Sequence, residues 1–169
     1  MSASNSFHYE LCCKGATWIR QRNNAEPWKT PNALSVVEIV CYGAENPDIY
    51  ATNGCESTVI EVKTSHTDFL ADQKKFSRTH TGYAMGDFRY YLCPEGIIKP
   101  EELPTDWGLL YYCNGKIRKV VQAKQQKAEK LWDLMLLSSI LRREGIWGKT
   151  LNYRQNAPNF EDNPENCEK

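Results

Sequence analysis

Three charged residues in the first half of the chain have the types and spacing of a metal-binding site. Glu61 and Lys63 end an apolar segment, and Asp48 lies thirteen residues before Glu61. Side chains alternate between the two faces of a strand, so Glu61 and Lys63 share one face. Ile60 and Val62 share the other. Because charges on a buried face are costly unless they are paired, this arrangement calls for an explanation.

Metal-assisted cleavage of a phosphodiester is the chemistry that these residue types favour. An Asn-Gly turn at 53–54 allows antiparallel pairing to bring Asp48 beside Glu61. Two close carboxylates repel, and a hard divalent cation such as Mg²⁺ holds both ionised. An ion bound by Asp48, Glu61 and the Val62 carbonyl polarises a phosphodiester and lowers the pKa of bound water. Lys63 would orient that water and stabilise the developing charge.

The short motif has a second match and a simpler interpretation. Asp72 and Lys74 repeat the D-x-K spacing, but in a polar segment expected to be helical, where residues two apart diverge. We interpret that match as a solvated helix face. The alternative for Glu61 and Lys63 is an exposed cross-strand ion pair, with Asp48 as a turn residue.

The elements that position these residues follow from the hydrophobic periodicity. Helices are expected over 6–22, with Gly15 as a weak point, from Ser65 to about residue 77, and over 122–143. The expected strands are rich in β-branched or aromatic residues and cover 35–42, 48–51, 57–63, 87–93, 108–112 and 116–121. This order predicts an α/β domain with one mixed sheet and helices against it.

Length and composition fit a single globular domain. The chain has 169 residues, of which 41% are hydrophobic and 25% charged. We expect one domain over 1–153, with its core over about 6–121, and a polar, mobile tail over 154–169.

The seven cysteines and the N-terminal sequence point to a reducing compartment. The cysteines form no C-x-x-C pair and have no histidine at a zinc-finger offset, so no zinc site is expected, and their odd number argues against a closed disulfide framework. No secretion signal is visible, and no apolar run approaches the ~20 residues of a membrane span. A cytoplasmic protein with no membrane association is therefore expected.

Charge gives only permissive evidence for nucleic-acid binding. Twenty-one basic residues balance 21 acidic ones, whereas nucleic-acid-binding proteins usually have a basic surplus. Residues 116–130 nevertheless hold six bases against one acid. The candidate nucleic-acid contacts are the bases Lys116, Arg118 and Lys119, with Tyr91 for base stacking. The alternative for the basic residues is a solvated face.

A longer pattern around the three charged residues resembles a known enzyme superfamily. Pro47-Asp48 followed by Glu61-Val-Lys63-Thr-Ser65-His-Thr-Asp68-Phe69-Leu-Ala-Asp72-Gln-Lys74 resembles the PD-(D/E)XK nucleases. It is most similar to the MmcB family of DNA-repair nucleases, whose pattern reads E-[VI]-K-x-S-x-x-D-F-x-x-D-x-K. The similarity continues through Phe88 to Pro94 and Leu103 to Leu109, and covers about residues 35–120.

This resemblance implies a restriction-endonuclease-like αβββαβ core and Mg²⁺- or Mn²⁺-dependent cleavage of DNA in repair or processing. The metal residues of the family correspond to Asp48 and Glu61, and its catalytic lysine to Lys63. Trp107 departs from the pattern, which has a small or polar residue there. The helix over 122–143 and the acidic tail also lie outside the pattern.

Further members of the site stay open at this point. Related nucleases often add an acid from the first helix, which here is Glu10. Glu38 is the rival and is slightly favoured, because its neighbours in the expected strand face away from it. Ser65 and Asp68 are explained by helix capping, whereas Asp72 and Lys74 could brace Lys63 or the phosphate backbone.

Two alternatives to a DNA-cleaving enzyme remain. The first is a non-catalytic nucleic-acid-binding module on the same fold. The second is a nuclease subunit that needs a helicase or methyltransferase partner, with the helix over 122–143 as the docking surface. A homodimer is also possible.

Overall fold

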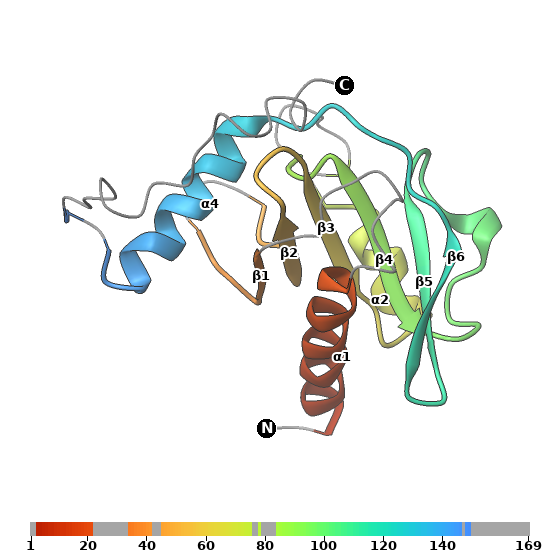
Figure 1. Ribbon diagram of the computed structural model, residues 1–169. Coiled ribbons are helices and arrows are strands. Elements are labelled where there is room, and N and C mark those ends of the chain that lie inside the picture. Colours follow the sequence, from red (N-terminus) through yellow and green to blue (C-terminus); the bar gives the residue numbers. More distant parts are fainter. Residues whose placement is uncertain are drawn as a thin grey trace.

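The computed structural model describes residues 3–21, 34–41, 45–75, 78, 84–146 and 148–149. Within them, six strands form one mixed sheet in the order β1 to β6, with helices on both faces (Figure 1). The predicted α/β class with a mixed sheet flanked by helices is therefore confirmed. The tail expected over 154–169 lies outside the described residues.

The sheet is antiparallel at both sides and parallel in its centre. Its strands are β1 (Leu34–Val37), β2 (Ile49–Thr52), β3 (Ser57–Val62), β4 (Phe88–Pro94), β5 (Gly108–Cys113) and β6 (Lys116–Val121). β1, β2 and β3 pair antiparallel, β3, β4 and β5 pair parallel, and β6 returns antiparallel to β5. The C-terminal ends of β1, β3 and β4 and the N-terminal end of β2 therefore lie along the same side of the sheet.

The turn between β2 and β3 sets the register that the site needs. The Asn53 side-chain oxygen accepts from the N–H groups of Cys55 and Glu56, at 2.9 and 2.8 Å. Gly54 has φ +94°, a conformation that favours glycine. Ile49 pairs with Ile60. The next residues outward are Asp48 and Glu61, as the turn predicted.

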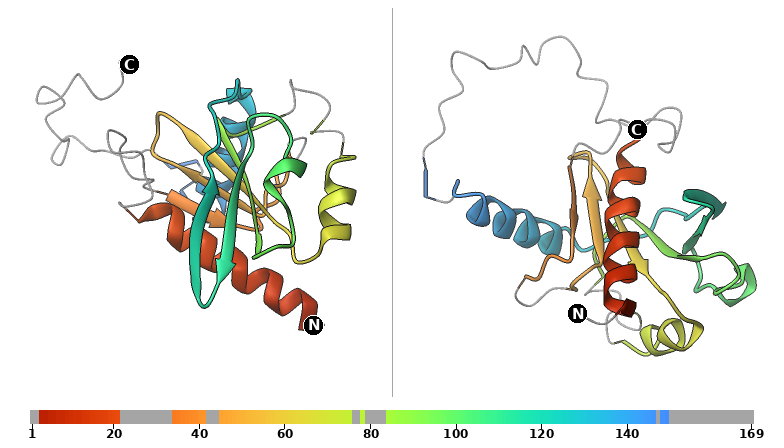
Figure 2. Two further views of the ribbon diagram at one scale, coloured as in Figure 1. Left: turned by 90° about the vertical axis from the view of Figure 1, so that its right-hand side faces the viewer. Right: turned by 90° about the horizontal axis from the view of Figure 1, so that it is seen from below.

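Helix α1 (Ala3–Arg20) covers one face of the sheet, and α2 (His66–Asp72) and α4 (Lys130–Arg143) lie on the other (Figures 1 and 2). Gly15, the expected weak point, allows α1 to approach the sheet closely. A Cβ there would lie 2.5 Å from Ile49 Cδ1 and 2.9 Å from Leu92 Cδ2. Ser65 is the N-cap of α2, and its hydroxyl accepts from the Asp68 N–H, as the capping pattern predicted.

Strand alternation divides the core between the two faces. Ile60 and Val62 pack under α1 with Leu11. On the opposite face, Phe69 of α2 packs with one set of apolar residues and Leu136 of α4 with another. Because Glu61 lies between Ile60 and Val62, its side chain points to the α2 face.

Three predicted elements are shorter than expected. The strand expected over 35–42 ends at Val37, because Glu38 has φ +47° and leaves the extended conformation. Helix α2 ends at Asp72 instead of about residue 77.

The helix expected over 122–143 begins only at Lys130. Residues 122–129 are not helical. N–H groups of this segment instead donate to carbonyls in the loops that connect the strands; the Gln126 N–H, for example, donates to the Asp87 carbonyl at 2.8 Å. The segment has no large apolar residue that a helix could bury, so tertiary hydrogen bonds decide its conformation.

No helix among the described residues combines the length and apolar character needed to cross a bilayer.

Candidate functional site

Asp48, Glu61 and Lys63 come together where β2 begins and β3 ends. The Lys63 ammonium nitrogen lies 3.2 Å from Glu61 Oε2 and 3.8 Å from Asp48 Oδ2. Lys63 continues β3 through a hydrogen bond from its N–H to the Leu92 carbonyl at 2.9 Å. The exposed ion pair considered as an alternative is wrong, because Glu61 and Lys63 are only 1% and 3% exposed.

Asp48 is held ionised at the more open side of the cluster. Its Oδ2 accepts a hydrogen bond from the Val62 N–H at 2.8 Å. Burial opposes the charge, but the hydrogen bond from His8, the Lys63 charge and the Val62 N–H together bring the pKa of Asp48 below its ordinary value. Its side chain is 22% exposed.

Glu61 is the least well compensated carboxylate. Burial and the nearby charge of Asp48 raise its pKa to about 7, against the opposing charge of Lys63. Its Oε1 is buried and makes no hydrogen bond. A guanidinium nitrogen of Arg78 lies 3.2 Å from this Oε1. The two groups form an ion pair, but without the geometry of a hydrogen bond. A buried acceptor without a hydrogen bond is costly, and the charge of Arg78 offsets part of this cost.

Lys63 is a buried cation among carboxylates. Burial lowers its pKa, but Glu61, Asp72 and Asp48 outweigh this effect and raise it above the ordinary value. Lys63 is therefore protonated at neutral pH, and it acts as a proton donor and a positive charge.

Asp72 belongs to this cluster, and its interpretation as part of a solvated helix face is wrong. It is 1% exposed. Its carboxylate lies 3.3 Å from Lys63 Nζ and 2.7 Å from Lys75 Nζ, and it accepts a hydrogen bond from the Tyr91 hydroxyl at 2.8 Å. Lys74 is exposed. The lysine that approaches the site from this segment is Lys75, 3.9 Å from Glu61.

Two arginines support the cluster from the α2 face. Arg78 donates to Asp72 through Nε at 2.9 Å and pairs with Glu45, which also pairs with Arg89. Both guanidinium groups lie over the Trp107 ring, at 5.0 and 4.6 Å from its centroid. Trp107, a departure from the family pattern, is therefore a packing partner of these cations.

Glu38 and Glu10, the two rivals for an additional acid, lie in different surroundings. The Glu38 N–H donates to the Asp48 carbonyl at 2.9 Å, and the Glu38 carboxylate lies 3.5 Å from His8 Nδ1. Glu10 instead pairs with Lys14 along α1 and is exposed. The geometry thus favours Glu38, although not for the reason expected from the sequence, because β1 ends at Val37 and Glu38 lies outside the strand.

The other candidates lie apart from the cluster or inside the core. Ser65 and Asp68 are exposed at the start of α2. Tyr91 was expected to stack on a base, but it is fully buried and stacks on Trp107 at 4.5 Å, so that role is wrong. Its neighbour Tyr90 is also buried. On β6, Lys116, Arg118 and Lys119 are exposed, and Arg118 pairs with Glu95.

Sequence reasoning missed several members of the site. His8 lies 3.5 Å from Asp48 Oδ2, and this hydrogen bond raises the pKa of His8. Its spacing of four residues from Cys12 in an expected helix was an available signal. Lys75 lies three residues after Asp72, which is also a helical spacing. Glu45 and Arg78 had no comparable signal.

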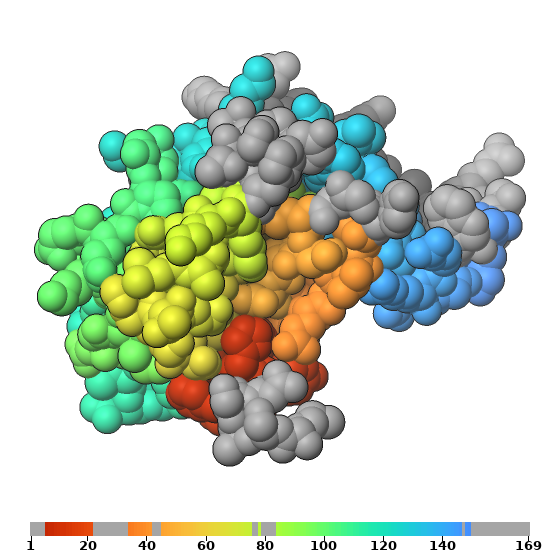
Figure 3. Space-filling view, turned by 180° about the vertical axis from the view of Figure 1, so that it is seen from behind, coloured from red at the N-terminus to blue at the C-terminus, as the bar shows by residue number. Residues whose placement is uncertain are grey.

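Figure 3 shows the N-terminal part of α1 at the surface between the segment around β1 and β2 and the segment of α2.

No family profile matches the sequence, and no curated protein matches it either. A solved structure has a similar fold: a protein of unknown function from Silicibacter pomeroyi, SPO1766. It shares 23% identity with this chain at a TM-score of 0.50, over 75% of this chain and 84% of the other. At this identity the match supports the fold alone.

Proposed function

We propose that this protein is a metal-dependent nuclease that hydrolyses phosphodiester bonds in DNA, with Asp48, Glu61 and Lys63 as its catalytic centre. The observation that carries the proposal is the convergence of two carboxylates on a buried, protonated lysine: Lys63 Nζ lies 3.8 Å from Asp48 Oδ2 and 3.2 Å from Glu61 Oε2. In the superfamily that the sequence resembles, these three residue types bind the metal and activate water.

The order of the elements supports the proposal. The chain runs α1, β1, β2, β3, α2, β4, which is the αβββαβ order of a restriction-endonuclease-like core. Asp48 stands before β2, while Glu61 and Lys63 are at the end of β3, the places where the family pattern has its metal and catalytic residues.

The donor set fits Mg²⁺ or Mn²⁺, since hard cations prefer oxygen ligands. Asp48 and Glu61 would hold the ion. The Val62 carbonyl would join them, because the N–H and C=O of a strand residue point to the same neighbour and the Val62 N–H bonds to Asp48. Such an ion polarises a phosphodiester and increases the acidity of a bound water.

The chain's own residues would orient the reactants and balance charge. Lys63 donates hydrogen bonds from a position fixed by Glu61 and Asp72, so it can orient a water and stabilise negative charge on a phosphate oxygen. Lys75, at the exposed side of Asp72, adds a positive charge where a phosphate would approach.

The test is a cleavage panel of duplex, single-stranded, flap and junction DNA, together with RNA, in Mg²⁺, Mn²⁺ or EDTA. We expect DNA cutting that EDTA abolishes and that Glu61→Gln and Lys63→Ala each reduce by about 10²–10³-fold. Glu101→Gln and Lys99→Ala make matched changes at exposed positions and should retain activity.

Two outcomes would contradict the proposal. Metal-dependent cutting that survives both Glu61→Gln and Lys63→Ala would exclude this site. A folded protein that binds DNA and cuts none of the substrates would instead support the non-catalytic binding module.

A further inference from the structure

A second group of ligand-type side chains lies beside the carboxylate cluster, between α1 and the end of β1. His8 and Cys12 are four residues apart on α1 and share one face of the helix. Cys12 Sγ lies 3.6 Å from His8 Nδ1, and a Glu38 oxygen lies 3.5 Å from the same nitrogen. One ligand atom from each residue lies within 4.8 Å of the other two.

These separations match those of a tetrahedral metal site. Bonds of about 2.0 Å to nitrogen or oxygen and about 2.3 Å to sulfur place ligand atoms about 3.3–3.5 Å apart at tetrahedral angles. The two distances from His8 Nδ1 are therefore close to those that a bound ion requires. The third separation, between Cys12 Sγ and the Glu38 oxygen, is at most 4.8 Å, so a bound ion would draw these two side chains together.

The second ring nitrogen of His8 is oriented as in a metal-binding histidine. Nε2 faces Asp48 Oδ2 at 3.5 Å. A ligating histidine usually donates its other N–H to a carboxylate, which fixes the tautomer and makes the ligating nitrogen more basic. With its proton on Nε2, His8 presents the Nδ1 lone pair to Cys12 and Glu38.

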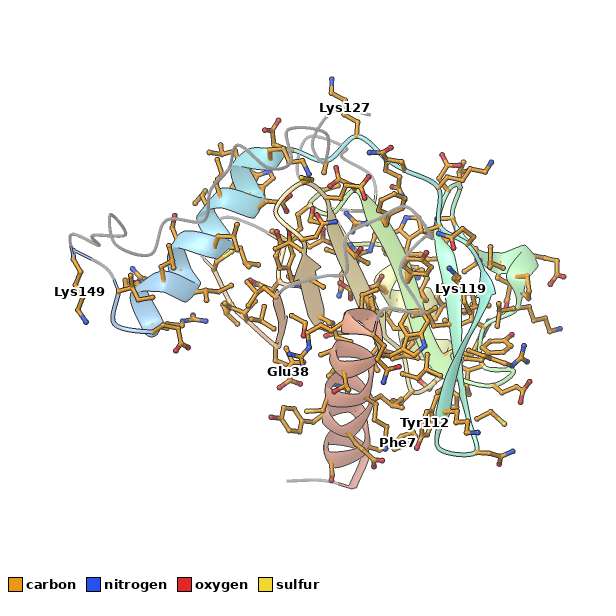
Figure 4. All side chains as sticks on the ribbon, viewed as in Figure 1. Phe7, Glu38, Tyr112, Lys119, Lys127 and Lys149 are labelled. Carbon is orange, nitrogen blue, oxygen red and sulfur yellow. The ribbon has the colours of Figure 1, made fainter. Side chains whose placement is uncertain are left out.

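The backbone of Glu38 supports a functional role for this group. Glu38 has φ +47°, a conformation that costs free energy for a residue other than glycine. It brings the Glu38 carboxylate beside α1 (Figure 4). Cys12 is fully buried, whereas the Glu38 side chain is 45% exposed, so the group is closed at the thiol and open at the carboxylate.

We propose that His8, Cys12 and Glu38 form a binding site for a transition-metal ion of the zinc class, separate from the oxygen-ligand site at Glu61. Thiolate and imidazole ligands select Zn²⁺ or Co²⁺ over Mg²⁺. Three protein ligands leave the fourth position for water, as in zinc sites that take part in reactions. Binding releases the Cys12 proton to solvent as the thiolate–metal bond forms. The site differs from the zinc-finger spacing that the sequence excluded, because it uses a single cysteine.

The test is a titration of the full chain with Co²⁺ under reducing conditions. We expect one thiolate-bound ion per chain, with a near-ultraviolet band from thiolate-to-cobalt charge transfer and visible bands of tetrahedral cobalt. Zn²⁺ should remove these bands, and excess Mg²⁺ should not. Glu61→Gln should keep them even where it abolishes DNA cleavage, so this site can fail or succeed independently of the proposed nuclease.

Two pairs of variants assign the ligands. Cys12→Ser should remove the near-ultraviolet band, and Cys13→Ser, at the exposed neighbouring cysteine, should keep it. Glu38→Gln should weaken Co²⁺ binding by about tenfold or more, and Glu10→Gln should not.

The proposal is overturned if no charge-transfer band forms with excess Co²⁺, or if the band survives Cys12→Ser. If Cys12→Ser does not fold, the exposed Glu38 decides: unchanged Co²⁺ affinity in Glu38→Gln also excludes the site.

Discussion

Lys63 and Asp72 form a buried ion pair, with Lys63 Nζ 3.3 Å from Asp72 Oδ1. Lys63 follows β3 and Asp72 ends α2, so the pair fixes this helix to the end of the strand. The same ammonium group contacts Glu61. Asp72 therefore fixes the position of the Lys63 ammonium group beside the Glu61 carboxylate.

Loss of the Asp72 carboxylate should destabilise the protein strongly. Asp72→Ala leaves Lys63 without one of its buried partners and removes the acceptor of the Tyr91 hydroxyl. We expect a loss of about 3–5 kcal/mol in the free energy of unfolding, measured by urea denaturation. Asp68→Ala, at an exposed position of the same helix, should cost less than about 1 kcal/mol. Equal losses in the two variants would show that Asp72 is not a buried partner of Lys63.

The raised pKa of Glu61 should make stability depend on pH. Its pKa rises from 4.5 in the unfolded chain to about 7 in the fold, so the folded state binds this proton more tightly. The resulting stabilisation is complete below pH 4.5 and is lost as the pH rises through about 7, a change of about 3 kcal/mol. Glu61→Gln has no ionisable group at this position and lacks this pH dependence. In EDTA, the variant should gain stability relative to wild type by about this amount between pH 4.5 and 8, and parallel stability curves would contradict the prediction.

Divalent cations should reverse this loss in the wild-type protein. At pH 8, an ion bound by Asp48 and Glu61 stabilises only the folded state, by about 3 kcal/mol at one hundred times its Kd. We therefore expect Mg²⁺ or Mn²⁺ to raise the melting temperature of the wild type. Glu61→Gln should show little increase, and Glu101→Gln should respond as the wild type does. An equal increase in Glu61→Gln would place the ion elsewhere.

The part of the site that the sequence predicted depends on local signals. Alternation along β3 placed Glu61 and Lys63 on one face, and the Asn53-Gly54 turn placed Asp48 opposite Glu61. Register within a hairpin follows from the turn and the hydrophobic pattern, both of which can be seen in a short stretch of sequence.

The rest of the site depends on contacts between distant segments. Asp72 resembled an exposed helix residue because Tyr91, whose hydroxyl donates to its carboxylate, lies on β4 and not near Asp72 in the sequence. Residues 122–129 have good helix formers, yet tertiary hydrogen bonds hold them in another conformation. Helix propensity and hydrophobic periodicity do not encode contacts between distant segments. They therefore could not predict the burial of Asp72 or the conformation of residues 122–129.

The basic residues of β6 should contribute to DNA binding through phosphate contacts if the sheet edge faces the substrate. Lys116→Ala combined with Lys119→Ala should then lower affinity for all sequences alike. It should also reduce the slope of log K against log salt by about 2, since each phosphate contact contributes about 0.9. Fluorescence anisotropy over a salt series measures this slope. Lys99→Ala combined with Lys149→Ala removes the same amount of charge at other exposed positions. If this control lowers the slope equally, the effect of the β6 variants comes from net charge and not from local phosphate contacts.

Tyr91 should act through stability and not through contact with DNA. Its hydroxyl donates to Asp72 at 2.8 Å, and its ring is buried against Trp107. Tyr91→Phe keeps the ring and removes a hydrogen bond to a charged acceptor, so we expect a loss of about 1.5–3 kcal/mol in the free energy of unfolding. DNA affinity, measured where both proteins are folded, should not change. Tyr9→Phe, at a residue that is 51% exposed, should change neither quantity. Weaker DNA binding by Tyr91→Phe at unchanged stability would restore the base-stacking role that the burial of Tyr91 argues against.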